Sequence, residues 1–166
     1  MLTVLRSTGF KVFGAMGLMF LATLVYADEH THKSSERGAE HSLNHGKKWE
    51  TDEKLRQGMD NILQVMTINQ EGIEKERLSA QDYQRLAEAV DKNVADIVKN
   101  CKLTKEADAA FHTVVLADLT QSTQLMRTSP KIQAQRVGAL GVLQSLRNYG
   151  EFFQHPGWHL GVTKSR

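Results

Sequence analysis

Cysteine is almost absent from this sequence, because Cys101 is the only one among 166 residues. A lone thiol excludes an intramolecular disulfide, and the chain also lacks the CxxCH motif that covalent haem attachment requires. An unpaired cysteine is buried, bound to a metal, or used between chains. Burial is the default among these, so we expect Cys101 to be reduced and shielded.

Catalytic motifs are lacking as well. No serine or cysteine nucleophile stands beside a histidine at a recognisable spacing, and no glycine-rich loop is present to bind phosphates. No pair of carboxylates can be assigned to one face from the sequence alone. We therefore expect a protein that is not an enzyme, and we assign no catalytic residue.

The first 27 residues predict a secretory signal peptide. Arg6 and Lys11 precede the uncharged run AMGLMFLATLVYA, and small residues stand at Val25 and Ala27, where signal peptidase prefers them. The apolar run is short for a membrane span and a polar segment follows at once, although a retained single-span anchor is the alternative. We expect a periplasmic protein that has no membrane contact once the signal is removed.

Removal of the signal also changes the charge balance. It takes away two of the 21 basic residues and no acidic residue, which leaves 19 of each sign. A formally neutral mature chain gives no electrostatic basis for binding nucleic acid.

The remaining chain divides into a tail and one helical domain. Residues 28–48 are polar, hold four histidines and show no apolar periodicity, which predicts a flexible tail. From residue 49 to about residue 160 the pattern is that of amphipathic helices. The expected organisation is therefore a signal peptide (1–27), a polar tail (28–48), a helical domain (49–160) and a short C-terminal tail (161–166).

Four amphipathic helices are expected in the helical domain, and no strand-like alternation competes with them. Helices of roughly 18 to 23 residues, each about 30 Å long and joined mostly by short turns, predict an all-α, antiparallel, up-down-up-down four-helix bundle. The predicted core positions are Leu55, Met59, Ile62, Leu63 and Met66; Tyr83, Leu86, Ala87, Val90, Val94, Ile97 and Cys101; Phe111, Val115, Leu119, Ser122 and Met126; and Ala139, Val142, Leu143, Leu146, Tyr149 and Phe153.

Capping residues set the expected helix boundaries. Thr51 or Asp52 should cap the first helix, which should end near Asn69, where Gly72 can act as a stop. Ser79 and Thr104 should cap the second and third helices, and Pro130 at the first helical position should begin the fourth.

The antiparallel order converts sequence position into depth along the bundle. Met59 and His112 each lie about eight residues into their helices, so both are expected roughly 12 Å below the same end, with Cys101 nearer the rim. A methionine sulfur, an imidazole and a thiolate suit Cu(I), and the first two also suit b-type haem iron. We therefore predict a metal site at Met59, Cys101 and His112. The alternatives are core packing for Met59, an inert buried thiol for Cys101 and a hydrogen-bonded structural role for His112.

Aromatic residues and a histidine are expected at the rim above this site. Trp49, Tyr149, His155 and Trp158 are interpreted first as a cap that closes the bundle, because such rings bury a large apolar area. The mouth of a ligand site would have the same composition, so these four residues are possible rim or secondary site residues.

The stretch LVYADEHTH contains a separate metal candidate. Cleavage after Ala27 would leave Asp28, Glu29 and His30 as the first three residues. The terminal amine, two deprotonated backbone amides and the imidazole then offer four nitrogens in a plane, which Cu(II) and Ni(II) prefer. The alternative is a chance histidine in a histidine-containing tail.

Three blocks of sequence resemble a family of small exported proteobacterial helical proteins described as DnrO-like. The blocks are GKKWETDEKLRQGM (46–59), NCKLTKEADAAFH (100–112) and YGEFFQHPGW (149–158). The resemblance covers most of the mature chain and implies a periplasmic location and a helical bundle, but it implies no substrate. More loosely, the expected architecture is similar to cytochrome b562-type four-helix bundles, which implies a methionine on the first helix facing a histidine on the last. Here the expected helical histidine, His112, is on the third helix.

The sequence therefore predicts a periplasmic copper-binding four-helix bundle whose partner is a metal ion. The alternatives are a non-covalent b-type haem electron carrier and a bundle that binds another periplasmic protein without a metal.

Overall fold

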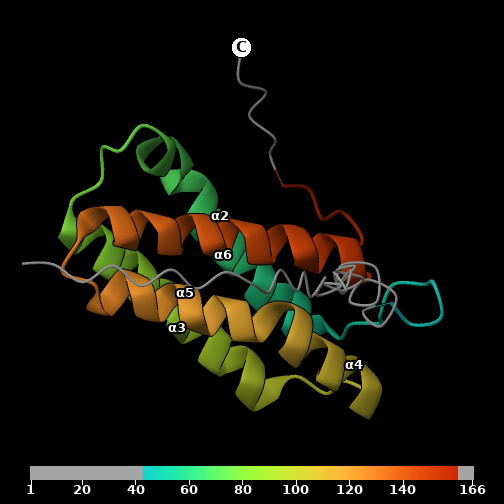
Figure 1. The fold of residues 1–166 in the computed structure, drawn as a ribbon. Coiled ribbons are helices and arrows are strands. Elements are labelled where there is room, and N and C mark those ends of the chain that lie inside the picture. The colour runs from blue at the N-terminus through green and yellow to red at the C-terminus, as the bar shows by residue number, and fades with distance from the viewer. Residues whose placement is uncertain (1–42, 161–166) are drawn as a thin grey trace, which may run out of the picture. The chain divides into compact units, whose positions relative to one another are not determined.

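The computed structural model describes residues 43–160, which all belong to one compact unit (Figure 1). These residues form four helices and contain no β-strand, only two isolated bridges. This confirms an all-α domain with four helices. The helices are α2 (Glu53–Glu74), α3 (Ala80–Asn100), a continuous third helix made of α4 (Lys105–Phe111), the π-helical turn η1 (His112–Leu116) and α5 (Ala117–Thr128), and α6 (Ile132–Phe152).

The apolar stripes of the helices meet in one core. Nearly all the predicted core positions are buried, and each large apolar side chain buried in this way stabilises the fold by about 1.5–3 kcal/mol. The exceptions are Leu63, Val94, Cys101 and Ser122, which are only partly buried. No helix within residues 43–160 has the length and apolar character that a membrane span requires.

The structure describes only part of the chain before and after the helical domain. The predicted signal peptide, residues 28–42 of the predicted tail and the C-terminal residues 161–166 are not among the described residues. Residues 43–48, which the sequence assigned to the tail, form a turn in which Asn44 and Lys47 are bridged.

Three predicted caps are confirmed. Asp52 Oδ1 accepts from the Leu55 N–H at 2.7 Å at the start of α2. Ser79 forms a reciprocal capping box with Asp82 at the start of α3. Thr104 Oγ1 accepts from the Ala107 N–H at 3.2 Å and begins α4.

The predicted end of α2 is wrong. The helix continues to Glu74 instead of ending near Asn69, and Gly72 lies within its last turn. Glu76 takes the left-handed conformation, with φ of 54°, and the Arg77 N–H donates to the Gly72 carbonyl at 2.8 Å. This is the arrangement in which a left-handed residue closes a helix, a position that glycine usually occupies. The prediction missed it because it relied on glycine to mark the end.

Arg136 of α6 supports this unusual helix end. Its Nε donates to the Ile73 carbonyl at 2.8 Å and its Nη2 to the Glu74 carbonyl at 3.1 Å. It also pairs with the Glu76 carboxylate at 3.2 Å. The last carbonyls of α2 are therefore satisfied by a residue from a distant part of the chain, which no local pattern could predict.

The predicted start of α6 is wrong by two residues. Lys131 is the cap and Ile132 the first helical residue, rather than Pro130. The Ser129 N–H still donates to the Leu125 carbonyl at 3.2 Å and so closes α5. Because Ser129 is extended at that point, Pro130 belongs to the turn between the two helices.

Several chain segments meet at one end of the bundle, which we call the rim end. The Trp49 N–H, ahead of α2, donates to the Phe152 carbonyl at 2.8 Å at the end of α6. The Lys102 N–H, just past α3, donates to Asp52 at the start of α2. Arg136 binds the opposite end of α2, so α2 and α6 run in opposite directions.

Gly138 allows α5 and α6 to approach closely. A Cβ at this position would lie 2.6 Å from the Ser122 carbonyl oxygen and 2.7 Å from Met126 Cγ. The backbone oxygen cannot rotate away, so we expect Gly138→Ala to lower the free energy of unfolding by about 1–3 kcal/mol, in spite of the better helix propensity of alanine.

Chemical denaturation measures this effect, with Gln133→Ala at an exposed position of the same helix as the control. The control should change stability by less than about 0.5 kcal/mol. Unchanged stability of Gly138→Ala would contradict the close packing of α5 on α6.

Candidate functional site

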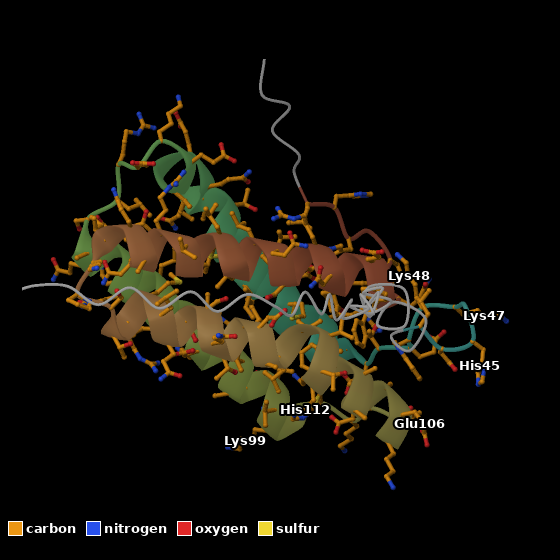
Figure 2. The ribbon with its side chains drawn as sticks, in the orientation of Figure 1. His45, Lys47, Lys48, Lys99, Glu106 and His112 are labelled. Carbon is orange, nitrogen blue, oxygen red and sulfur yellow. The ribbon has the colours of Figure 1, made fainter. Side chains whose placement is uncertain are left out.

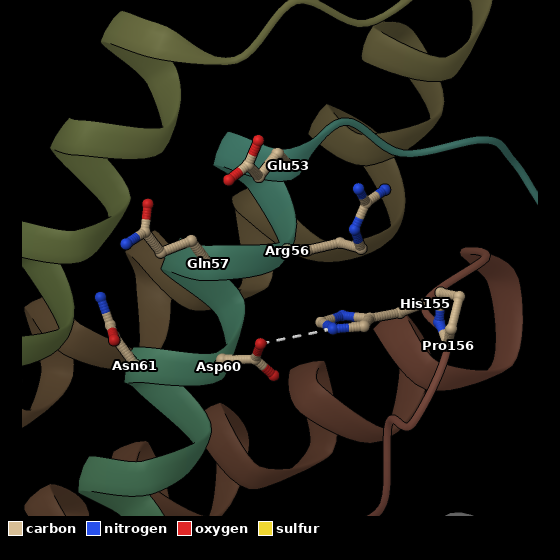
Figure 3. A pocket seen from close by; sticks show the side chains of 7 residues that line it. All are labelled: Glu53, Arg56, Gln57, Asp60, Asn61, His155 and Pro156. Atoms are coloured by element: carbon tan, nitrogen blue, oxygen red, sulfur yellow. Dashed lines mark ion pairs between the residues drawn. The ribbon is translucent and has the colours of Figure 1, made fainter.

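A polar cleft of about 600 Å³ lies at the rim end, between α2 and the segment that follows α6 (Figure 3). One wall comes from a single face of α2, because its residues recur at helical spacing. The other wall comes from the segment after α6. The lining residues are Glu53, Arg56, Gln57, Asp60 and Asn61 on α2, with His155 and Pro156 opposite.

Backbone hydrogen bonds hold the segment after α6 against the residues ahead of α2. Trp49 donates its N–H to the Phe152 carbonyl and accepts from the Gln154 N–H, both at 2.8 Å. The Thr51 hydroxyl donates to the Gln154 carbonyl at 2.5 Å. These bonds fix the chain on both sides of the cleft and place His155 opposite α2.

A reversal of the chain then encloses the His155 side chain. Gly157 has a φ of 80°, which favours glycine, and the Trp158 N–H donates to the His155 carbonyl at 3.1 Å. The Trp158 ring centroid lies 5.0 Å from that of His155, and the Tyr149 centroid 5.7 Å from it. Only 6% of the His155 side chain is exposed.

Both ring nitrogens of His155 have polar partners. Nδ1 lies 3.0 Å from the Tyr149 hydroxyl, and Nε2 lies 3.4 Å from Asp60 Oδ2, as the dashed line in Figure 3 marks. Tyr149 is fully buried, whereas 56% of the Asp60 side chain is exposed. The imidazole therefore joins the core of the bundle to the open cleft.

The tautomer of His155 decides which atom donates in each of these contacts. The Thr51 hydroxyl donates to the Gln154 carbonyl, and Thr51 Oγ1 accepts from Arg56 Nη1 at 3.0 Å. The Tyr149 hydroxyl and His155 Nδ1 can each be the donor in the hydrogen bond between them. With the proton on Nδ1, Nε2 presents a lone pair beside the Asp60 carboxylate, where a cation would be stabilised; with the proton on Nε2, Nε2–H faces that carboxylate at 3.4 Å.

The protonation states of the site favour a neutral imidazole. Burial is the largest influence on the pKa of His155 and lowers it; Asp60 raises the pKa and Arg56 lowers it, and the net direction is downward from the usual value. Burial raises the pKa of Tyr149, so the phenol keeps its proton near neutral pH. His155 is therefore in the form that binds metal ions.

An imidazole nitrogen and a carboxylate oxygen on the wall of an open cleft can bind a transition-metal ion. Two ligand atoms that each lie about 2.1 Å from the same ion are about 3.0 Å apart when they are neighbours in a square-planar site and about 3.4 Å apart in a tetrahedral site. The separation of Nε2 from the Asp60 oxygen is 3.4 Å. Within residues 43–160, no group of three or more His, Cys, Asp or Glu side chains is placed to hold a metal, so the cleft offers two protein ligands.

The structure does not bring together the predicted ligands Met59 and His112. Met59 is fully buried in the core, whereas 54% of the side chain of His112, which is labelled in Figure 2, is exposed. The His112 imidazole lies 3.9 Å from Asp108 on the same helix. The π-helical turn explains the difference. The Ala117 N–H donates to the His112 carbonyl five residues earlier, so this turn holds more residues than an α-helical one and rotates His112 relative to Leu119.

Cys101 caps the end of α3 and is partly buried against the core. Its N–H donates to the Ile97 carbonyl at 2.8 Å. Burial raises the pKa of the Cys101 thiol, and the charges of Asp52 and Asp108 act in the same direction. The site therefore favours a protonated thiol over the thiolate that binds copper.

The predicted rim residues do lie together. Tyr149 stacks on Phe153 at 5.4 Å and meets Trp158 edge-to-face at 4.8 Å, both measured between ring centroids. Trp49 is packed against the same core. The other predicted metal residues, Asp28, Glu29 and His30, lie outside the described residues.

Sequence reasoning missed Asp60, Arg56 and Thr51. A polar stripe on α2 at helical spacing was visible in the sequence and could have indicated one wall of a cleft. Nothing in the sequence showed that the segment HPGW returns to this stripe, because that contact depends on tertiary packing.

No model of a known protein family, no curated protein and no solved structure matches this chain. The resemblance to DnrO-like proteins and to cytochrome b562-type bundles stays a prediction.

The Tyr149 hydroxyl provides a test of the buried network. We expect Tyr149→Phe to lower the free energy of unfolding by about 1–2 kcal/mol, because it leaves His155 Nδ1 without its partner. Tyr83→Phe is the control, since the Tyr83 ring is also buried but its hydroxyl lies nearer the surface and has no hydrogen bond within residues 43–160. Thermal or denaturant unfolding of both variants measures the difference, and equal effects would contradict the role of the Tyr149 hydroxyl.

Proposed function

We propose that this protein is an exported metal-binding protein of the copper type, in which an up-down-up-down bundle carries a metal site in the rim cleft. Asp60 and His155 are the two protein ligands. The observation that supports this most is the 3.4 Å separation of His155 Nε2 from Asp60 Oδ2 at the wall of an open cleft. Export to the periplasm rests on the signal peptide predicted at residues 1–27.

The surroundings of His155 are those of a metal ligand rather than of a surface histidine. A histidine that binds metal through one nitrogen usually donates the other N–H to a fixed acceptor, which orients the ring. The Tyr149 oxygen has this position at 3.0 Å from Nδ1. The ring is also enclosed, while the cleft leaves Nε2 within reach of an ion.

Copper is the metal that we expect to bind most tightly. Divalent first-row ions follow an affinity order that peaks at Cu(II) for most nitrogen and oxygen sites. Zn(II) would fit the tetrahedral separation of the two ligands and is the second candidate. With two protein ligands, the ion takes its other ligands from water or from another molecule.

The function can be tested by Cu(II) titration of the mature full-length chain carrying His30→Ala, which removes the predicted N-terminal site. Quenching of Trp158 fluorescence reports binding near His155, because the two rings are 5.0 Å apart. We expect Asp60→Asn and His155→Gln each to weaken Cu(II) binding at least about tenfold, since each removes one of two ligands.

His112→Gln is the control, because this exposed imidazole lies outside the cleft. It should leave the Trp158 response unchanged, and Trp158→Phe should abolish that response. Asp60 is largely exposed, so Asp60→Asn should keep the metal-free melting temperature. Wild-type affinity in Asp60→Asn and His155→Gln would refute the cleft as the metal site.

The N-terminus predicted after Ala27 offers a second copper site that serves the same function. In the chain that retains His30, we expect a square-planar Cu(II) spectrum that disappears when one residue is added before Asp28. Mass spectrometry of the exported protein checks the cleavage site. A mature chain that begins elsewhere would remove this second site.

The visible spectrum and metal content of the purified protein separate the alternatives. A Soret band would favour the haem carrier. If the purified protein contained neither haem nor metal, this result would favour a bundle that binds another protein.

A further inference from the structure

The rim cleft is much larger than one metal ion requires. Its volume is about 600 Å³, whereas a water molecule occupies about 30 Å³. Clefts of about 300–1,000 Å³ are typical of sites for small molecules. Asp60 and His155 supply two ligands, which leaves at least two positions of a four-coordinate ion open. Both the volume and the coordination leave room for a second, small ligand.

The charges around the cleft indicate the kind of ligand. An imidazole that binds a metal ion is neutral, so Glu53 and Asp60 carry two negative charges and Arg56 carries one positive charge. A divalent ion would leave the cleft with a net positive charge of one. A ligand with a single carboxylate would neutralise it.

Arg56 is the positively charged residue among those that line the cleft, and such a carboxylate could pair with it. Its Nη1 donates to the Thr51 carbonyl at 2.7 Å and to Thr51 Oγ1 at 3.0 Å, which anchors the side chain. Its Nε and Nη2 have no hydrogen-bond partner among residues 43–160. Arg56 and Asp60 are one helical turn apart and both extend from α2 toward the side where His155 lies (Figure 3). A guanidinium with a free edge matches the two oxygens of a carboxylate.

We propose that the cleft binds its metal together with a small amino-carboxylate chelator, of which an α-amino acid is the simplest. The amine and one carboxylate oxygen of the chelator complete the coordination of the ion that Asp60 and His155 hold. The carboxylate also pairs with the free edge of Arg56. This inference rests on the proposed function, because the chelator is held through the metal.

Equilibrium dialysis of isotope-labelled glycine against the mature full-length chain with His30→Ala tests the proposal. We expect glycine to be retained only when Cu(II) is present, at up to one glycine per chain. Asp60→Asn should abolish this retention, which separates the cleft from other histidines of the chain.

Arg56→Gln separates recognition of the chelator from binding of the metal. This variant should retain at least tenfold less glycine, whereas its affinity for Cu(II) alone should stay equal or increase, because a positive charge near the ion is removed. Damage to the fold would instead weaken both the retention of glycine and the affinity for Cu(II). Arg147→Gln, which changes an exposed arginine on α6, is the control and should alter neither measurement.

The outcomes are distinguishable. Cu(II) binding at Asp60 and His155 without retention of glycine would overturn this inference and leave the proposed function intact. If Arg56→Gln retained as much glycine as the wild type, the proposal that Arg56 recognises the carboxylate would be wrong. Absence of Cu(II) binding at the cleft would overturn both proposals.

Discussion

The hydrogen bond between the Tyr149 hydroxyl and His155 Nδ1 is the interaction on which the rim end depends. Tyr149 is on the last turns of α6, and its ring is in contact with Phe153, His155 and Trp158. The Thr51 hydroxyl, ahead of α2, donates to the Gln154 carbonyl next to His155. One buried phenol therefore fixes the segment that follows α6 against the end of that helix. A buried hydroxyl needs such partners, because an unsatisfied one destabilises the fold by about 1–3 kcal/mol.

This constraint also determines what the cleft offers to a ligand. The hydrogen bond to Tyr149 at Nδ1 holds the imidazole so that Nε2 faces Asp60. The backbone contacts of Trp49 keep this segment beside α2. The site is thus a consequence of how the two ends of the helical domain are joined. Its ligands come from a helix face and from a turn, so neither segment forms the site alone.

Much of the fold could be predicted from the sequence because the patterns that specify it are local. Apolar residues at helical spacing predicted the four helices, and Asp52, Ser79 and Thr104 predicted three of their starts. The end of α2 could not be predicted in this way, since Arg136 of α6 binds its last carbonyls and Glu76 takes a conformation that glycine usually adopts.

The candidate site was predicted less well, for two physical reasons. An unbroken α-helical period was assumed through His112, and the π-helical turn at that residue changes the direction of the side chain without changing the apolar pattern around it. The pairing of His155 with Asp60 depends on the turn at Gly157 and on packing of Trp158, which are tertiary features. The grouping of Tyr149, His155 and Trp158 was foreseen because all three belong to one short segment near the end of α6.

The tautomer of His155 in the metal-free protein tests the central claim most directly. Long-range proton–nitrogen correlation spectra of uniformly nitrogen-15-labelled protein at neutral pH distinguish a protonated ring nitrogen from one with a lone pair, and His155→Gln identifies the resonances. Our account predicts a proton on Nδ1 and a lone pair on Nε2, which is ready to bind a metal ion beside Asp60. A proton on Nε2 with a lone pair on Nδ1 would contradict it, because His155 would then simply donate a hydrogen bond to Asp60 and close the rim.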